Sequence, residues 1–88
     1  MSIFIGGSAY NMARDIADGF IVVSERTFRN FGRKDLADFA QETNRLLQEV
    51  RSAQPDSSDI PAIQKRQRKM QRLLQALTLA NASVSRRT

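Results

Sequence analysis

Cysteine, histidine and tryptophan are all absent from this 88-residue chain. Without cysteine, the chain cannot build the disulfide framework on which many small secreted domains depend. Without histidine and cysteine, the common zinc sites cannot form, and the usual catalytic bases and nucleophiles are missing. We therefore expect a non-enzymatic protein with no metal and no cofactor.

Long apolar runs are also missing. The longest one after the first residues is the four-residue stretch Phe20-Ile-Val-Val, which is far too short to span a bilayer. Residues 1–7 lack the basic region and the apolar length of a secretory signal. We expect a cytoplasmic protein without a membrane span, and secretion by a signal-independent route stays open.

The two prolines, Pro55 and Pro61, bracket a turn rich in aspartate and serine. Helices usually end before a proline and tolerate one in their first turn. The sequence therefore predicts helices over 35–53, beginning at Asp35, and over 60–84, joined by a short turn that makes them antiparallel.

Both predicted helices carry apolar or small residues at intervals of three and four, which is the spacing of one helix face. In the first they are Leu36, Phe39, Ala40, Thr43, Leu46, Leu47, Val50 and Ala53. In the second they are Ile60, Ile63, Gln67, Met70, Leu74, Leu77, Asn81 and Val84, with Leu73 and Ala80 beside them. The polar Gln67 and Asn81 either lie at the edge of this face or set the register of pairing.

A third helix is predicted over 8–31, with Ser8 as its N-cap and Gly32 as its stop signal. Its apolar positions follow helical spacing, although the β-branched residues within 20–23 leave a strand there as an alternative. The fold class is therefore all-α: an antiparallel helical hairpin with an additional N-terminal helix, in a single domain over 1–88.

Two apolar segments are candidates for contact with another chain. Residues 1–7 form an arm that ends in two glycines, and this arm either is disordered or docks onto another surface. Residues 85–88 form a C-terminal tail. Part of the first predicted helix is apolar on more than one side. The candidate contact residues are Ile3, Phe4, Phe20, Ile21 and Val22.

Charge is divided unevenly along the chain. Residues 1–59 hold seven basic and nine acidic residues, whereas 60–88 hold seven basic and no acidic ones. The candidate basic face consists of Lys65, Arg66, Arg68, Lys69 and Arg72. Three interpretations are open: a solvated helix face, a contact for an acidic protein, or a surface for nucleic acid.

Residues 46–64, with the sequence LLQEVRSAQPDSSDIPAIQ, form two helix ends around a polar turn. This stretch resembles the small helical-hairpin proteins of bacterial type III secretion systems, namely needle subunits and the needle's small co-chaperones. The resemblance implies polymerisation through helix packing, or the holding of an aggregation-prone secreted partner. The basic second helix and the apolar N-terminal arm depart from that class, and from needle subunits in particular.

A chain of this size buries a marginal core, and small helical chains often gain stability through association. We therefore predict an interaction or assembly component, adaptor or chaperone-like, that binds a protein partner or forms a homo-oligomer. The alternative is a small basic nucleic-acid-binding protein that uses the Lys65–Arg72 face. Phosphate binding would depend steeply on salt, whereas apolar helix docking would not.

Overall fold

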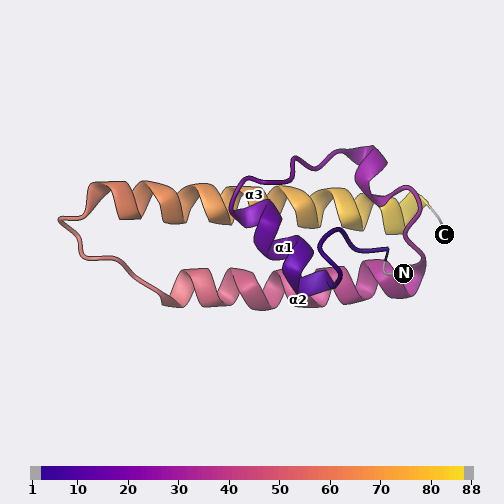
Figure 1. Ribbon diagram of the computed structural model, residues 1–88, viewed down its shortest axis with the longest axis horizontal. Coiled ribbons are helices and arrows are strands. Elements are labelled where there is room, and N and C mark those ends of the chain that lie inside the picture. The colour runs from indigo at the N-terminus through magenta and orange to yellow at the C-terminus, as the bar shows by residue number, and fades with distance from the viewer. Residues whose placement is uncertain (1–2, 87–88) are drawn as a thin grey trace.

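The computed structural model describes residues 3–86 of the chain. Within these residues the helices are α1 (Ala9–Ala17), the short 3-10 helix η1 (Glu25–Phe28), α2 (Arg33–Ser52) and α3 (Ile60–Arg86), and there is no strand. Helices α2 and α3 lie side by side and antiparallel, and α1 crosses one face of the pair (Figure 1). The all-α hairpin with an additional N-terminal helix is confirmed.

The hairpin is fixed at both ends by local capping. Gly32 takes the N-cap position of α2, and its N–H donates to Asp35 Oδ2 at 2.9 Å. The helix therefore begins at Arg33, two residues before the predicted start, because Asp35 caps from the third helical position. Asp59 caps α3 by accepting from the Ala62 N–H at 3.2 Å, and α3 continues to Arg86 instead of ending at 84.

The predicted helix over 8–31 is wrong beyond its second turn. Ser8 caps it as expected, because its Oγ accepts from the Asn11 N–H at 3.1 Å. The helix ends at Ala17, because Gly19 adopts a φ of +85° that reverses the chain. The N–H groups of Gly19 and Phe20 then donate to the carbonyls of Ile16 and Asp15, which is the Schellman pattern.

Residues 20–24 are neither helix nor strand, so both alternatives for this segment fail. The chain runs extended past Val23 and tightens into η1, where the Ser24 N–H donates to Thr27 Oγ1 at 2.9 Å. Gly32 is not the stop signal of a first helix, since it opens α2 with a φ of −76°. This irregular segment carries Phe28 and Phe31 back into the core.

The core consists of two clusters placed along the hairpin. One is aromatic: Phe28 lies 5.3 Å from Phe31 and 5.0 Å from Phe39, centroid to centroid, and Met12 and Ile16 of α1 join it. The other is aliphatic and contains Ala13, Ala17, Leu46, Leu47, Leu73 and Leu77. Helix α1 contributes to both, so it binds the two arms into one unit.

The buried face of α3 is rotated from the predicted one. Leu73 and Ala76 are fully buried, whereas Leu74 is 45% exposed and Ile60 59% exposed. The reason is that α3 packs against α1 as well as α2, and the alanines allow three helices to approach closely. Gln67 and Asn81 are exposed and lie outside the buried face, in agreement with the interpretation that they lie at its edge.

Candidate interaction surface

The loop after α1 holds two large apolar side chains in solvent. Phe20 is 80% exposed and Val22 is 90% exposed. Their neighbours point inward: Ile21 is half-buried against the aromatic cluster, and Val23 is buried within it. Buried and exposed side chains alternate along this loop, so Ile21 and Val23 anchor it while Phe20 and Val22 stay in solvent.

The N-terminal arm belongs to a different part of the surface. Phe4 is half-buried and packs edge-on against Phe31 at 5.4 Å, so it docks onto the chain's own core, while Ile3 and Ile5 stay exposed. Phe4 lies beside Asp38 of α2, whereas Phe20 lies beside Lys65 of α3. The five predicted contact residues are thus not brought together into one patch.

The predicted basic face is also divided. Lys65 and Arg68 are exposed. Arg66 instead turns toward α2, where its Nε donates to Val50 O at 3.1 Å and its Nη2 to Arg51 O at 2.9 Å. The last carbonyls of a helix lack partners within the helix and lie at its negative end. Arg66 therefore caps the carboxyl end of α2.

Two more of the predicted cations hold the carboxyl end of α1, Arg72 at a backbone carbonyl and Lys69 at a carboxylate. Arg72 Nη1 donates to Ala17 O at 3.0 Å, and Lys69 Nζ lies 3.5 Å from Asp18 Oδ1. A Cβ added to Gly19 would come within 3.2 Å of the Arg72 guanidinium. Three of the five cations hold the helices together, so the face that spacing predicted is not a single solvated surface.

These capping contacts were missed by sequence reasoning, although part of the signal was present. In an antiparallel hairpin, the second turn of one arm lies beside the last turn of the other. A cation such as Arg66 at that position can reach unpaired carbonyls, and α3 provides it. The contacts of Lys69 and Arg72 could not be predicted, because the predicted helix over 8–31 has no end at Ala17.

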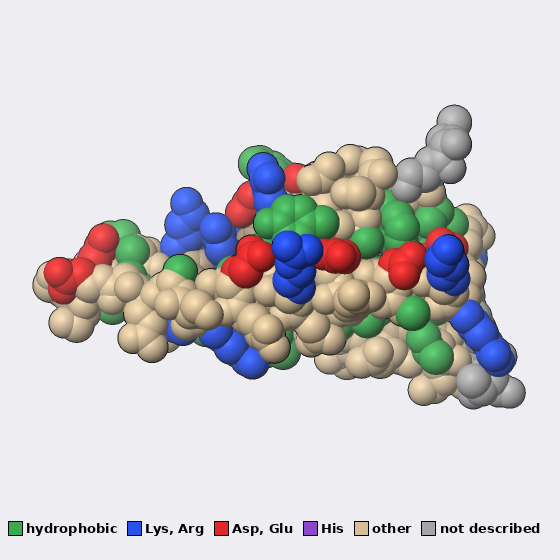
Figure 2. Space-filling view, turned by 90° about the horizontal axis from the view of Figure 1, so that it is seen from below, with side chains coloured by type: hydrophobic (Ala, Val, Ile, Leu, Met, Phe, Trp, Pro, Cys, Tyr) green, Lys and Arg blue, Asp and Glu red, His purple; other side chains and the backbone are tan. Residues whose placement is uncertain are grey.

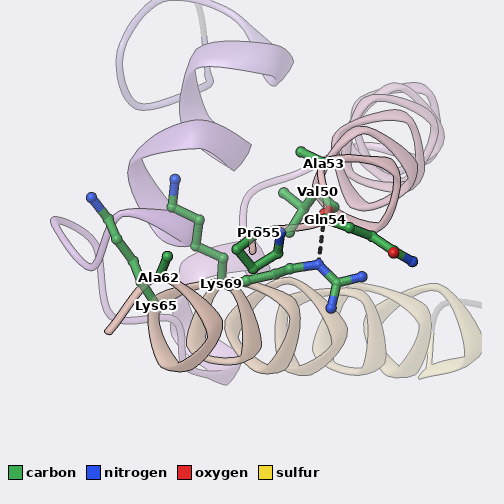
Figure 3. A pocket seen from close by; sticks show the side chains of 8 residues that line it. Val50, Ala53, Gln54, Pro55, Ala62, Lys65 and Lys69 are labelled. Atoms are coloured by element: carbon green, nitrogen blue, oxygen red, sulfur yellow. Dashed lines mark hydrogen bonds between the residues drawn. The ribbon is translucent and has the colours of Figure 1, made fainter. Parts of the chain in front are cut away.

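A groove lies between the arms at the end nearest the turn (Figure 3). It has a volume of about 410 Å³. Within residues 3–86, no acidic residue lines it. Its apolar lining comes from Val50 of α2, Ala53 and Pro55 just after that helix, and Ala62 of α3. Lys65 and Lys69 extend from α3 along one side of it.

Two further hollows continue this groove along α3. One shares Lys65 and Lys69 with the groove and adds Phe20 and Arg72, and the next shares Arg72 and adds Val22. The exposed apolar loop and the groove near the turn therefore form one continuous surface. We call it the α3 surface. Its lining is apolar with cations along it, and it includes one acidic residue, Asp18, which pairs with Lys69.

The α2 side of the molecule differs in character. Figure 2 views the molecule from this side and shows acidic and basic side chains interspersed along it. Arg45 Nη1 lies 3.6 Å from Glu42 Oε2, and Arg45 Nε lies 3.8 Å from Glu49 Oε1. Such exposed pairs neutralise one another, so the charge of one sign is concentrated on α3.

Comparison of the chain with protein-family models, with curated proteins and with solved structures gives no match. Over residues 3–86, every helix falls short of the apolar length that a membrane crossing requires. Acidic side chains in the same residues do not gather in threes as a metal site would require. The function is therefore inferred from the α3 surface.

Proposed function

We propose that this chain is a non-enzymatic protein–protein interaction or assembly component, an adaptor or chaperone-like helical hairpin. The observation that carries the proposal is the exposure of Phe20 and Val22 on a loop anchored by Ile21 and Val23. Burying a side chain of this kind is worth about 1.5–3 kcal/mol. The fold itself leaves that free energy unused, and contact with another chain would recover it.

The proposal is tested by comparing partners of tagged chains purified from cells of the source organism. Phe20→Asp with Val22→Asp removes the apolar pair, and Asn81→Asp with Ala82→Asp adds the same charge at exposed positions of α3. We expect the control and the unmodified chain to retain the same stoichiometric partner and the first variant to lose it, with unchanged circular dichroism. Equal retention by all three chains would contradict the proposal.

A narrower form of the proposal follows from the resemblance of residues 46–64 to type III secretion hairpins. In that form the partner is a small secreted helical protein that the hairpin holds before export. The same purification tests it, because the partner would then be a short helical chain that aggregates when released. A partner of another kind would leave the broader proposal standing and remove the narrower one.

Nucleic-acid binding through α3 is the second candidate, favoured by the exposure of Lys65 and Arg68 on a helix without acidic residues. The other three cations of the Lys65–Arg72 face are held by carbonyls or by Asp18. Two free cations would give a log–log salt slope of about −2 on duplex DNA, whereas five would give about −4 to −5. Anisotropy titrations over a range of salt concentrations distinguish these cases from the absence of binding.

A further inference from the structure

We propose that the groove near the turn binds an amphipathic helix of a partner protein, with an apolar stripe flanked by acidic residues. This inference rests on the proposed function and names the surface and the chemistry of the partner. The helix would lie between the distal ends of α2 and α3 and reach Phe20 along the α3 surface.

The three α-helices differ in length, and α1 is the shortest. At 1.5 Å per residue, the nine residues of α1 cover about 13 Å, whereas α2 with 20 residues and α3 with 27 extend about 30 and 40 Å. The polar contacts of α1 nearest the turn are Tyr10 Oη to Glu49 Oε2 at 3.5 Å and Asp18 to Lys69. Beyond them the hairpin has two layers where its middle has three.

Apolar side chains in this uncovered part are less buried than those beneath α1. Val50 and Ala62, which line the groove, are only half-buried, although the helical period places them on the inner faces of the arms. The equivalent positions under α1, such as Leu47 and Leu73, are buried. A helix set beside the end of α1 would complete the third layer and cover them.

The groove is also lined by charge of one sign. The lining of the groove holds Lys65 and Lys69 on one side and no acidic residue within the described chain. At the neighbouring end of α1, Asp18 already pairs with Lys69. An incoming helix with carboxylates on its flank would meet Lys65 and share Lys69 in the same manner, and a basic helix would be repelled.

A second copy of this chain does not supply such a helix. The exposed residues of α2 are polar, charged or alanine, without a large apolar side chain. Leu74 and Ile60 are exposed on α3, but the exposed glutamines 64, 67 and 71 lie between them on the same side of the helix, and α3 has no carboxylate that could meet Lys65. The occupant is therefore a different chain of opposite charge.

A labelled peptide of about 18 residues, or five turns, provides the probe. It carries leucines at helical spacing and glutamates at the flanking positions. One comparison peptide has the same composition in scrambled order, and a second has lysines in place of the glutamates. Fluorescence anisotropy with the full chain should give a dissociation constant at least about tenfold lower for the acidic amphipathic peptide than for either comparison.

Variants locate the binding site. Lys65→Glu should weaken binding of the acidic peptide several-fold, whereas Arg68→Glu, the same change three residues away and outside the groove, should not. Ala62→Trp should fill the groove and abolish binding, while Ala82→Trp, at an exposed position of the same helix, should leave it intact. Thermal unfolding of each variant confirms that the fold is retained.

Three outcomes would overturn the inference. They are no binding of the acidic peptide at hundreds of micromolar, equal binding of the scrambled peptide, and equal losses in Lys65→Glu and Arg68→Glu. Sedimentation of the chain with vesicles of phosphatidylserine and phosphatidylcholine, lost in Lys65→Glu, would instead assign the surface to lipid. If partner capture depends on Phe20 and Val22 but not on Lys65 or Ala62, the groove is wrong and the proposed function stands.

Discussion

Leu73 and Leu74 are adjacent residues of α3 with opposite environments. Leu73 has no exposed surface, and Leu74 is 45% exposed. We expect Leu73→Ala to lower the free energy of unfolding by about 2–4 kcal/mol, because it leaves a cavity in the aliphatic cluster. Leu74→Ala should cost less than about 1 kcal/mol. Chemical denaturation of both variants measures the difference, and equal losses would mean that α3 is rotated from the orientation described.

Gly19 carries a second prediction at this scale. Its φ of +85° disfavours any side chain, and a Cβ would lie 3.2 Å from the Arg72 guanidinium. Gly7 has a similar φ of +93° but no neighbour within 4 Å of the added atom. We expect Gly19→Ala to lower stability by about 1–2 kcal/mol and Gly7→Ala by less. Thermal unfolding compares the two, and a larger loss at Gly7 would speak against the contact of Arg72 with α1.

The helix ends supply a prediction at the scale of elements. Arg66 donates to two carbonyls in the last turn of α2, so Arg66→Met should lower the free energy of unfolding by about 1–3 kcal/mol. Arg68→Met makes the same change at an exposed position and should stay within about 0.5 kcal/mol of the unmodified chain. Urea unfolding measures both. Similar values for the two variants would show that the capping contacts add nothing to stability.

The elements predicted correctly are those with local signals. The turn between α2 and α3 is marked by two prolines and capped by Asp59, and the regular spacing on either side extends over many turns. The predicted helix over 8–31 runs too far, because the apolar spacing continues on both sides of Gly19. Its role as a C-terminal cap depends on a positive φ, which periodicity does not reveal.

The surface was predicted only in part, for a different physical reason. Of the candidate contact residues within 20–22, Phe20 and Val22 are exposed and Ile21 is half-buried, and their contact with a partner stays a prediction. The basic residues were grouped by spacing on one helix, but their directions are set by carbonyls on α1 and α2. Long-range partners of this kind become visible only when all three helices are placed. The same applies to α3, where the position of α1 decides which leucine is buried.

Association is the prediction for the whole molecule. The described chain has extents of 46 × 26 × 19 Å and leaves Phe20 and Val22 in solvent. We expect it to form complexes at high concentration, through this loop when no partner is present. Phe20→Asp should shift sedimentation equilibrium at hundreds of micromolar toward the monomer mass. A monomer mass for the unmodified chain, with solubility unaffected by Phe20→Asp, would contradict this expectation.

The short length of α1 has a consequence for local opening. Backbone amides become accessible to deuterium through fluctuations that cost least where few side chains pack around the helix. The end of α2 after Glu49 and the first two turns of α3 lie beyond the polar contacts of α1, while the middle of both helices lies beneath it. Deuterium uptake should therefore be fast near the turn and slow toward Phe39 and Ala76. A helix bound beside α1 would slow uptake at the turn end and leave the middle unchanged.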